Sequence, residues 1–377
     1  MRIVIAPDSF KGSLSSAEVA QAMARGVGHV LPQAELVLLP LSDGGEGLVD
    51  SLTEASGGEL LDVDVIGPLG SPVQATMGLM GGGRTAVIEM AQASGLILVS
   101  ESKRNPLVTT TFGTGELIRK ALDLGCDHLI IGIGGSATND GGMGMAQALG
   151  FRFLDAEGAP LGSGGGELAR LERIDARGVD PRLAQVRIDV ACDVNNPLTG
   201  PQGASYIYGP QKGATPEMVE LLDGALVNYE RILLKDLNQD VGKVPGAGAA
   251  GGLGAALMAL LKGSLVSGIE LVLDVLGFDK KLLGAQLILT GEGKFDAQSA
   301  YGKVPMGVAR RGKKHGVPVC VIAGSVLPGA KVLHGEGVSA YFSILNQPMS
   351  LQEAMTRGAE LVEYQAAQVV RLFCAGR

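Results

Sequence analysis

The stretch that decides the fold is RIVIAPDSFKG (residues 2–12), an apolar strand that ends at a proline, an acid, a lysine and a glycine. Ligands of open α/β sheets bind beyond the carboxyl ends of the strands. Glycine there lets the backbone approach an anion, while acids and lysines can hold metal and phosphate. The same pattern recurs at residues 41–47, 133–142, 191–197 and 288–296, so the sequence indicates an α/β enzyme.

The residues that follow the first strand predict a parallel sheet. A capping box at Ser15-x-x-Glu18 marks the start of a helix that extends to about Leu31. A second strand is expected over residues 35–41, and a second helix extends to about Ala55. This β-α-β-α order is typical of the opening of a parallel sheet that is covered by helices.

The rest of the chain divides into two patterns. The C-terminal part repeats the alternation, with strands expected at 286–290, 318–323 and 340–345 and a long helix from Ser350 to about Phe373. The middle part differs from both ends, because it predicts a hairpin and then longer helical segments. Its expected elements are strands at 73–80, 85–90, 128–133 and 186–192, a helix at 142–149 and a long helix after Pro216.

Neither terminal part has enough strands for a sheet of its own. We therefore predict an α/β fold with two unlike domains. Residues 1–65 and 283–377 are expected to form a Rossmann-like parallel-sheet domain, and residues 66–282 an inserted mixed α/β domain.

Composition argues against several classes of protein. The formal net charge of −8 disfavours a nucleic-acid surface, which needs a basic face. The longest uncharged stretch, residues 244–261, contains Pro245 and five glycines and does not resemble a membrane span. The N-terminus has no apolar signal-peptide region, and the four cysteines are scattered. We expect a cytoplasmic protein with reduced thiols that binds neither membrane nor nucleic acid, and the sequence leaves monomer and homodimer open.

One motif offers an alternative to phosphate chemistry. Gly132-x-Gly134-x-x-Ala137 resembles a dinucleotide fingerprint, and Asp155 lies about where a ribose-binding acid belongs. The turn then continues through polar residues to Gly142 instead of entering an apolar helix. A turn of this length is too long for that motif. An NAD-dependent dehydrogenase acting on small hydroxyacids therefore remains a remote alternative, and a non-catalytic two-lobed sugar-acid-binding protein is a third.

The polar residues of the glycine-rich loops match what phosphoryl transfer requires, namely cations around the phosphate, a magnesium ion held by carboxylates and an acid near the acceptor hydroxyl. The lysines are Lys11, Lys212, Lys294 and Lys303, and the acids at expected strand ends are Asp8, Asp43, Asp193, Glu292 and Asp296. No Gly-Lys pair is followed by Ser or Thr, so the chain lacks a Walker A loop.

Taken together, these loops resemble those of the glycerate kinase type I family. The resembling segments are residues 7–12, 42–47, 132–142, 191–198, 209–214, 246–254 and 290–296, in order over nearly the whole chain. The resemblance implies phosphorylation of D-glycerate that depends on ATP and Mg²⁺, with 2-phosphoglycerate as the product generally assigned. It also implies two unlike α/β domains with the active site in the cleft between them. From the residues alone, 3-phosphoglycerate stays open as the product.

Within that frame, loop chemistry suggests a role for each residue. We predict that Asp193 orients the glycerate hydroxyl and takes its proton, and that Lys11 and Lys212 neutralise phosphate and carboxylate charge. The magnesium candidates are Asp43, Glu292 and Asp296. The candidates for binding substrate or phosphate are Asp8, Ser9, Gly44, Gly45, Gly134, Gly135, Ser136, Thr138, Asn139, Asn195, Gly291 and Lys294.

Overall fold

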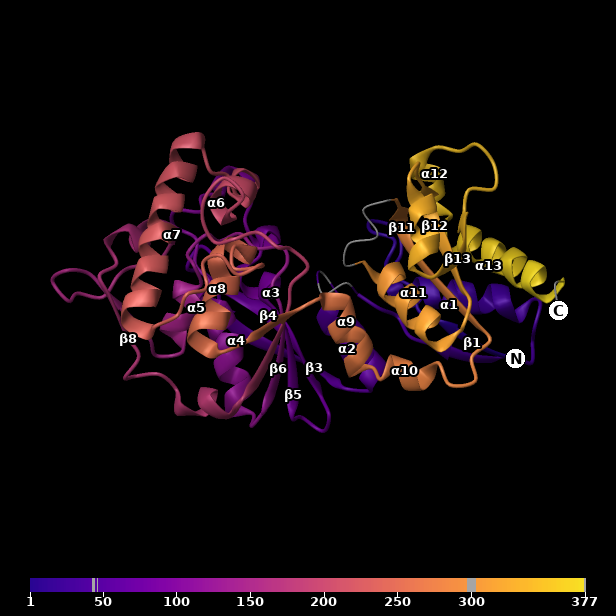
Figure 1. The fold of residues 1–377 in the computed structure, drawn as a ribbon, viewed down its shortest axis with the longest axis horizontal. Coiled ribbons are helices and arrows are strands. Elements are labelled where there is room, and N and C mark those ends of the chain that lie inside the picture. The colour runs from indigo at the N-terminus through magenta and orange to yellow at the C-terminus, as the bar shows by residue number, and fades with distance from the viewer. Residues whose placement is uncertain (43–44, 46, 297–302, 376–377) are drawn as a thin grey trace. The chain divides into compact units, whose positions relative to one another are not determined.

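The chain forms two compact units in a computed structural model that describes residues 1–42, 45, 47–296 and 303–375 (Figure 1). Unit 1 comprises Met1–Asp43 and Gly268–Arg377, and unit 2 comprises Gly44–Ser267. The predicted Asp43 and Gly44 lie outside the described residues.

Unit 1 contains a five-stranded sheet in which every neighbouring pair is parallel. The strand order is β13-β12-β11-β1-β2. The strands are β1 (Arg2–Ile5), β2 (Glu35–Leu38), β11 (Leu287–Phe295), β12 (Val319–Val326) and β13 (Val338–Ser343). The helices are α1 (Ser16–Gly28), α9 (Gly268–Val275), α10 (Phe278–Lys281), α11 (Val304–His315), the 3₁₀ helix η7 (Ala330–Glu336), α12 (Leu351–Thr356) and α13 (Gly358–Ala375).

The sequence signals at the helix ends of unit 1 are partly confirmed. The capping box is present at α1, where the Ser15 and Glu18 side chains each bond the other's backbone N–H. The prediction of a single long helix after Ser350 was wrong, because the helix is interrupted between α12 and α13. The Ser13 hydroxyl donates to the carbonyl of Met355 at 2.7 Å, and Gly358 packs closely against Ser13. The break therefore lets the C-terminal segment contact the chain just before α1.

Unit 2 contains a six-stranded mixed sheet of order β10-β9-β6-β5-β4-β3. Strands β10, β9, β6 and β5 are parallel, and β4 is antiparallel to both its neighbours. The strands are β3 (Glu59–Ile66), β4 (Pro72–Met80), β5 (Thr85–Glu89), β6 (His128–Gly132), β9 (Arg187–Ala191) and β10 (Ser264–Val266), and a separate pair is formed by β7 (Arg152–Leu154) and β8 (Arg173–Asp175).

The helices of unit 2 contribute apolar side chains to its core. They are α2 (Leu48–Ser56), α3 (Met90–Ser94), α4 (Phe112–Asp123), α5 (Met143–Ala148), α6 (Ala204–Tyr208), α7 (Pro216–Leu237) and α8 (Ala249–Leu261). Short 3₁₀ helices are η1 (Leu96–Leu98), η2 (Glu101–Lys103), η3 (Gly165–Arg170), η4 (Pro181–Gln185) and η5 (Pro210–Lys212). The α/β class, with a parallel sheet made from both chain ends and a separate mixed sheet, is confirmed.

The units divide earlier in the chain than we predicted, at 43/44 and 267/268 instead of 65/66 and 282/283. Strand β3 pairs with β4 along its whole length, which places residues 59–66 in unit 2. At the other boundary, Arg311 of α11 forms ion pairs with Glu270 of α9 and with Asp279 of α10, which places both helices in unit 1.

Within the described residues, no helix is both long enough and apolar enough to cross a membrane. All four cysteines are free thiols.

Candidate active site

In unit 1, the predicted acids gather at the carboxyl edge of the parallel sheet. Asp8 follows β1, whereas Glu292 lies in β11 and Asp296 follows that strand. All three are nearly buried, with exposed fractions of 8%, 5% and 9%. The backbone N–H of Asp8 donates to the carbonyl of Gly291, so the chain leaving β1 is bonded directly to β11. The sheet therefore brings these carboxylates to one edge. The prediction that Glu292 lies at a strand end was wrong, because β11 continues to Phe295 instead of ending at residue 290.

Lysines accompany these acids. Lys303 forms an ion pair with Glu292 at 3.2 Å, and Lys294 forms one with Asp296 at 3.4 Å. Lys11 is exposed in the loop after β1, where Ser9 donates its N–H to the Asp8 carboxylate at 2.6 Å. Among the described residues there is no group of three His, Cys, Asp or Glu side chains that could hold a metal ion. At this edge Glu292 and Asp296 are therefore each paired with a lysine.

In unit 2, the loop between β6 and α5 (residues 133–142) has an exposed tip and a buried base. Gly134 and Gly135 are exposed, and Gly135 has a positive φ of 73°. Thr138, Asn139 and Asp140 are fully buried. Gly45 approaches the tip so closely that a Cβ added at Gly134 would lie 3.4 Å from its Cα. Two of the predicted glycine segments therefore meet here.

Asp140 holds the base of this loop. Its carboxylate accepts from the N–H and the hydroxyl of Thr111, both at 2.8 Å, and from the N–H groups of Gly142 and Gly144. Burial raises the pKa of Asp140, and these donors act in the opposite direction. The carboxylate thus links the loop to the starts of α4 and α5. The sequence did not lead us to assign a role to Asp140, although this residue lies in the glycine-rich segment 133–142.

Lys212 contacts the same loop from inside. Its side chain is only 1% exposed, and Nζ donates to the carbonyl of Thr138 at 2.7 Å. Burial lowers the pKa of Lys212 to about 7, while the charge of Asp140 acts to raise it. Nearby, the amide of Asn139 donates to the Ser205 hydroxyl at 2.9 Å. The geometry places Lys212 behind the loop backbone, unlike the exposed Lys11.

The start of α8 packs backbone to backbone against this loop. Ala250, Gly251 and Gly252 all adopt left-handed conformations, and the N–H of Gly141 donates to the carbonyl of Gly251 at 3.0 Å. A Cβ added at Gly251 would lie 2.1 Å from the carbonyl oxygen of Thr138. Only glycine therefore fits at position 251 without moving the loop.

The variant Gly251→Ala is expected to lower the free energy of unfolding by about 2 kcal/mol or more, since it adds a left-handed alanine and a steric overlap. Gly224→Ala is the matched control, because Gly224 lies inside α7 and an added Cβ meets nothing within 4 Å. That control is expected to raise stability by about 0.5–1 kcal/mol. Urea unfolding of both variants measures the difference, and equal stabilities would contradict the packing argument.

Asp193 lies just beyond the carboxyl end of β9. It is exposed, and its carboxylate accepts from the Ser267 hydroxyl at 3.0 Å. The following turn is fixed by Asn196, whose amide donates to the carbonyl of Gln202 and accepts from the Tyr208 hydroxyl. Asn195 is exposed beside it. The Asp193 carboxylate is therefore accessible and lies next to a turn that hydrogen bonds fix.

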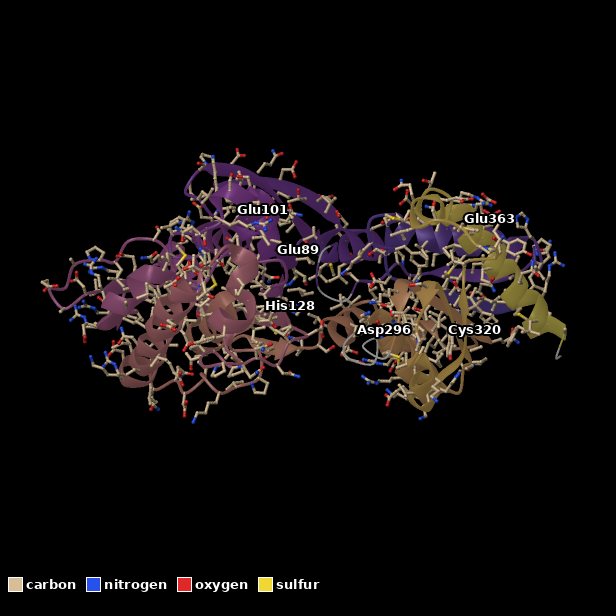
Figure 2. The ribbon with its side chains drawn as sticks, turned by 90° about the horizontal axis from the view of Figure 1, so that it is seen from above. Glu89, Glu101, His128, Asp296, Cys320 and Glu363 are labelled. Carbon is tan, nitrogen blue, oxygen red and sulfur yellow. The ribbon has the colours of Figure 1, made fainter. Side chains whose placement is uncertain are left out.

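Glu89 is a buried acid that the sequence analysis missed. It is the last residue of β5, is 5% exposed and is labelled in Figure 2. Its carboxylate accepts from the N–H of Val49, the second residue of α2, at 2.8 Å. An acid directly after an apolar strand was the available signal, but no glycine loop follows Glu89.

The dinucleotide fingerprint does not have its expected geometry. Gly132 ends β6, but α5 begins only at Met143, so no tight strand-to-helix turn exists. Asp155, the proposed ribose-binding acid, pairs with Arg170 at 2.8 Å and accepts from the N–H of Ala159. The loop is therefore longer than a Rossmann turn, and its acid has local structural partners.

Known proteins resemble the chain over its whole length. A model of the glycerate kinase family matches residues 3–374. The chain is 53% identical over 359 residues to a protein named glycerate 2-kinase from Escherichia coli K12, covering 95% of this chain and 94% of that protein. It is 51% identical to a glycerate kinase from Bacillus subtilis 168, covering 98% of this chain and 97% of that protein. A crystal structure described as a putative glycerate kinase 2 from Salmonella typhimurium LT2 superposes with a TM-score of 0.92 at 50% identity, covering 100% of this chain and 99% of that chain.

Proposed function

This chain belongs to the glycerate kinase family, and we propose that it transfers the terminal phosphoryl group of ATP to the 2-hydroxyl of D-glycerate, giving 2-phosphoglycerate. The observation that carries the proposal is the 53% identity to the E. coli protein named glycerate 2-kinase, over nearly the full length of both chains. Family membership makes the chain a phosphotransferase, and the named relative supports the finer choice of hydroxyl.

Asp193 is the proposed acceptor-side group. Its carboxylate is exposed, and Ser267 fixes one of its oxygens. In phosphoryl transfer the transition state is loose, so a carboxylate need only orient the hydroxyl and take its proton late. We propose that Asp193 does both for glycerate.

The exposed glycine tip at Gly134 and Gly135 is the proposed anion contact in unit 2. Backbone N–H groups at such a tip suit either a phosphate or the glycerate carboxylate. Lys212 is buried behind the tip and donates to Thr138, so we propose that it acts through the position of the loop. Lys11 and Lys294, which are exposed in unit 1, are the proposed direct contacts for phosphate charge.

The carboxylates of unit 1 fit the donor set that Mg²⁺ prefers, which is one or two carboxylates together with phosphate oxygens and water. Glu292 and Asp296 offer such oxygens at one strand end, and each is paired with a lysine there. We propose that they hold the ion of MgATP, together with Asp43, which lies outside the described residues. When bound, the ion would neutralise charge on the phosphate oxygens.

A coupled assay tests the proposed reaction. Enzyme, D-glycerate and MgATP are mixed with enolase but without phosphoglycerate mutase, and phosphoenolpyruvate absorbance is followed. A rise is expected, because enolase accepts 2-phosphoglycerate directly.

The other outcomes separate the alternatives. If ADP is released without a rise in absorbance, phosphoglycerate mutase is added. A rise after this addition would indicate 3-phosphoglycerate as the product. No rise after it would indicate ATP hydrolysis. No ADP release, together with a nicotinamide absorbance change when NAD⁺ is supplied, would favour the dehydrogenase.

A further inference from the structure

Glu89 is a nearly buried acid to which the proposed reaction gives no task. It ends β5, and its neighbour across the sheet is Gly132, where β6 ends and the loop to α5 begins. Its carboxylate accepts from the N–H of Val49 at 2.8 Å. Burial raises the pKa of Glu89, and hydrogen bonding from the backbone at the start of α2 opposes that change. The side chain thus serves as an acceptor at the N-terminal end of α2.

Helix α2 lacks a cap of its own. Its N-cap residue is Gly47, which has a φ of 85° and provides no side-chain hydrogen bond. The first N–H groups of a helix need acceptors, and a carboxylate at that end is stabilised by the helix dipole. Glu89 supplies this acceptor from 40 residues further along the chain. The start of α2 is therefore located by a strand end of the sheet and not by its own sequence.

The location matters because a glycine segment precedes α2. Gly45 approaches Gly134 closely, and Gly134 belongs to the exposed tip proposed to contact an anion. The Glu89 side chain bonds the N–H of Val49 in the first turn of α2, and the Glu89 backbone is paired with Gly132 at the end of β6. Glu89 thus stands between the two glycine segments, at the edge of the sheet where strands β5 and β6 end.

We propose that Glu89 is a positioning residue for the reaction: by binding the first turn of α2, it holds Gly45 against the Gly134 tip so that the tip keeps its anion-binding shape. The role is indirect, since the carboxylate is nearly buried and already accepts from a backbone N–H. It rests on the proposed function, because the anion is taken to be glycerate or the phosphate of ATP.

The chain offers a matched control at Glu116. This glutamate of α4 also accepts a backbone N–H from a distant strand, that of Ile66 at 2.7 Å, within the same unit. The contact fastens α4 to β3 and has no part in the glycine segments described above. Loss of Glu116, which is partly buried, therefore reports the cost of removing a side-chain acceptor of a distant backbone N–H outside the glycine segments.

The test compares Glu89→Ala, Glu89→Gln and Glu116→Ala in the full-length protein. Both alanine variants are expected to lower the melting temperature. Only Glu89→Ala is expected to lower kcat/KM, by about ten- to a hundredfold, because a displacement on the order of 1 Å in a positioning group has effects of that size. Glu89→Gln keeps an acceptor oxygen and is expected to recover most of that loss.

Hydrogen exchange supplies a readout that does not depend on activity. In Glu89→Ala, exchange is expected to rise both at Val49, whose N–H bonds Glu89, and at Ala137, whose N–H donates to the carbonyl of Ser94 just after the tip, whereas in Glu116→Ala the exchange at Ala137 stays as in the wild type. If the wild type itself phosphorylates no glycerate, the proposed function fails, and exchange alone decides the positioning role.

Two results would overturn the inference. One is Glu89→Ala that matches Glu116→Ala in both kcat/KM and exchange. The other is Glu89→Gln that is folded but as inactive as Glu89→Ala, which would mean that the charge of Glu89 acts directly.

Discussion

Replacing Asp193 by Asn is expected to lower kcat for glycerate phosphorylation by about 10²–10⁴, the range that a positioned general base contributes. The amide keeps the shape of the carboxylate and an oxygen that can accept from Ser267, so the turn after β9 should keep its position. What is lost is the ability to take the hydroxyl proton. The KM values are expected to change much less than kcat, and steady-state ADP release with varied glycerate and varied ATP measures both.

Two further variants serve as comparisons for this prediction. Asp240→Asn makes the same chemical change at another exposed aspartate of unit 2 and is expected to leave kcat unchanged. Ser267→Ala removes the donor that holds Asp193 and is expected to lower kcat by less than Asp193→Asn does. Near wild-type turnover of folded Asp193→Asn would remove Asp193 from the mechanism.

The largest stability effect is expected for Asp140→Ala, which should lower the free energy of unfolding by about 3–6 kcal/mol. Thr111, Gly142 and Gly144 would each keep a buried N–H without its acceptor, at about 1–3 kcal/mol for each such group. Water entering the space would recover part of this loss. Urea unfolding at neutral pH measures the change, and activity should fall with it because the glycine loop loses its base.

Asp62→Ala serves as the control for this variant. The Asp62 carboxylate lies at an exposed site, where it accepts a hydrogen bond from the Thr76 hydroxyl. Its removal is expected to change the free energy of unfolding by no more than about 0.5 kcal/mol. Similar losses for both variants would show that burial of Asp140 has no special energetic weight.

Asp140 also has an expected signature in the pH dependence of stability. Its pKa is raised by burial, so the folded state binds more protons than the unfolded state between the ordinary pKa and the raised one. Stability contributed by this group is therefore greatest at low pH and declines as pH rises through that window. Asp140→Asn is expected to remove this slope.

Local signals in the sequence predicted local structure well. The capping box at Ser15 and the hairpin of β4 and β5 form as expected, because both depend on residues close in the chain. The unit boundaries depended on pairing that no local pattern reveals. Residues 59–65 follow the second expected helix and were assigned to the parallel-sheet domain, yet they belong to β3, which pairs with β4.

The candidate site shows the same limit at the level of single residues. Lys11 and Lys212 look alike in sequence, since each lies in a glycine-rich loop, but one is exposed and the other is 1% exposed. Burial arises from packing of distant segments, so it separates their roles only once the fold is known. Glu89 was missed for the converse reason: its partner, 40 residues away, is the backbone N–H of Val49, and a backbone group leaves no signal in the sequence.

Unit 1 is built from two segments that lie far apart in the sequence, and this affects how the protein folds during translation. Strand β1 is synthesised first, but in the finished sheet Ile3 pairs with Leu287 of β11. Unit 2, with a sheet drawn from residues 59–266 and an apolar core drawn from residues 65–261, can close while that partner has not yet been translated. Until then β1 can pair only with β2, and its other edge stays open. Open strand edges slow folding and expose the chain to aggregation. We therefore expect unit 2 to fold first and unit 1 to assemble last.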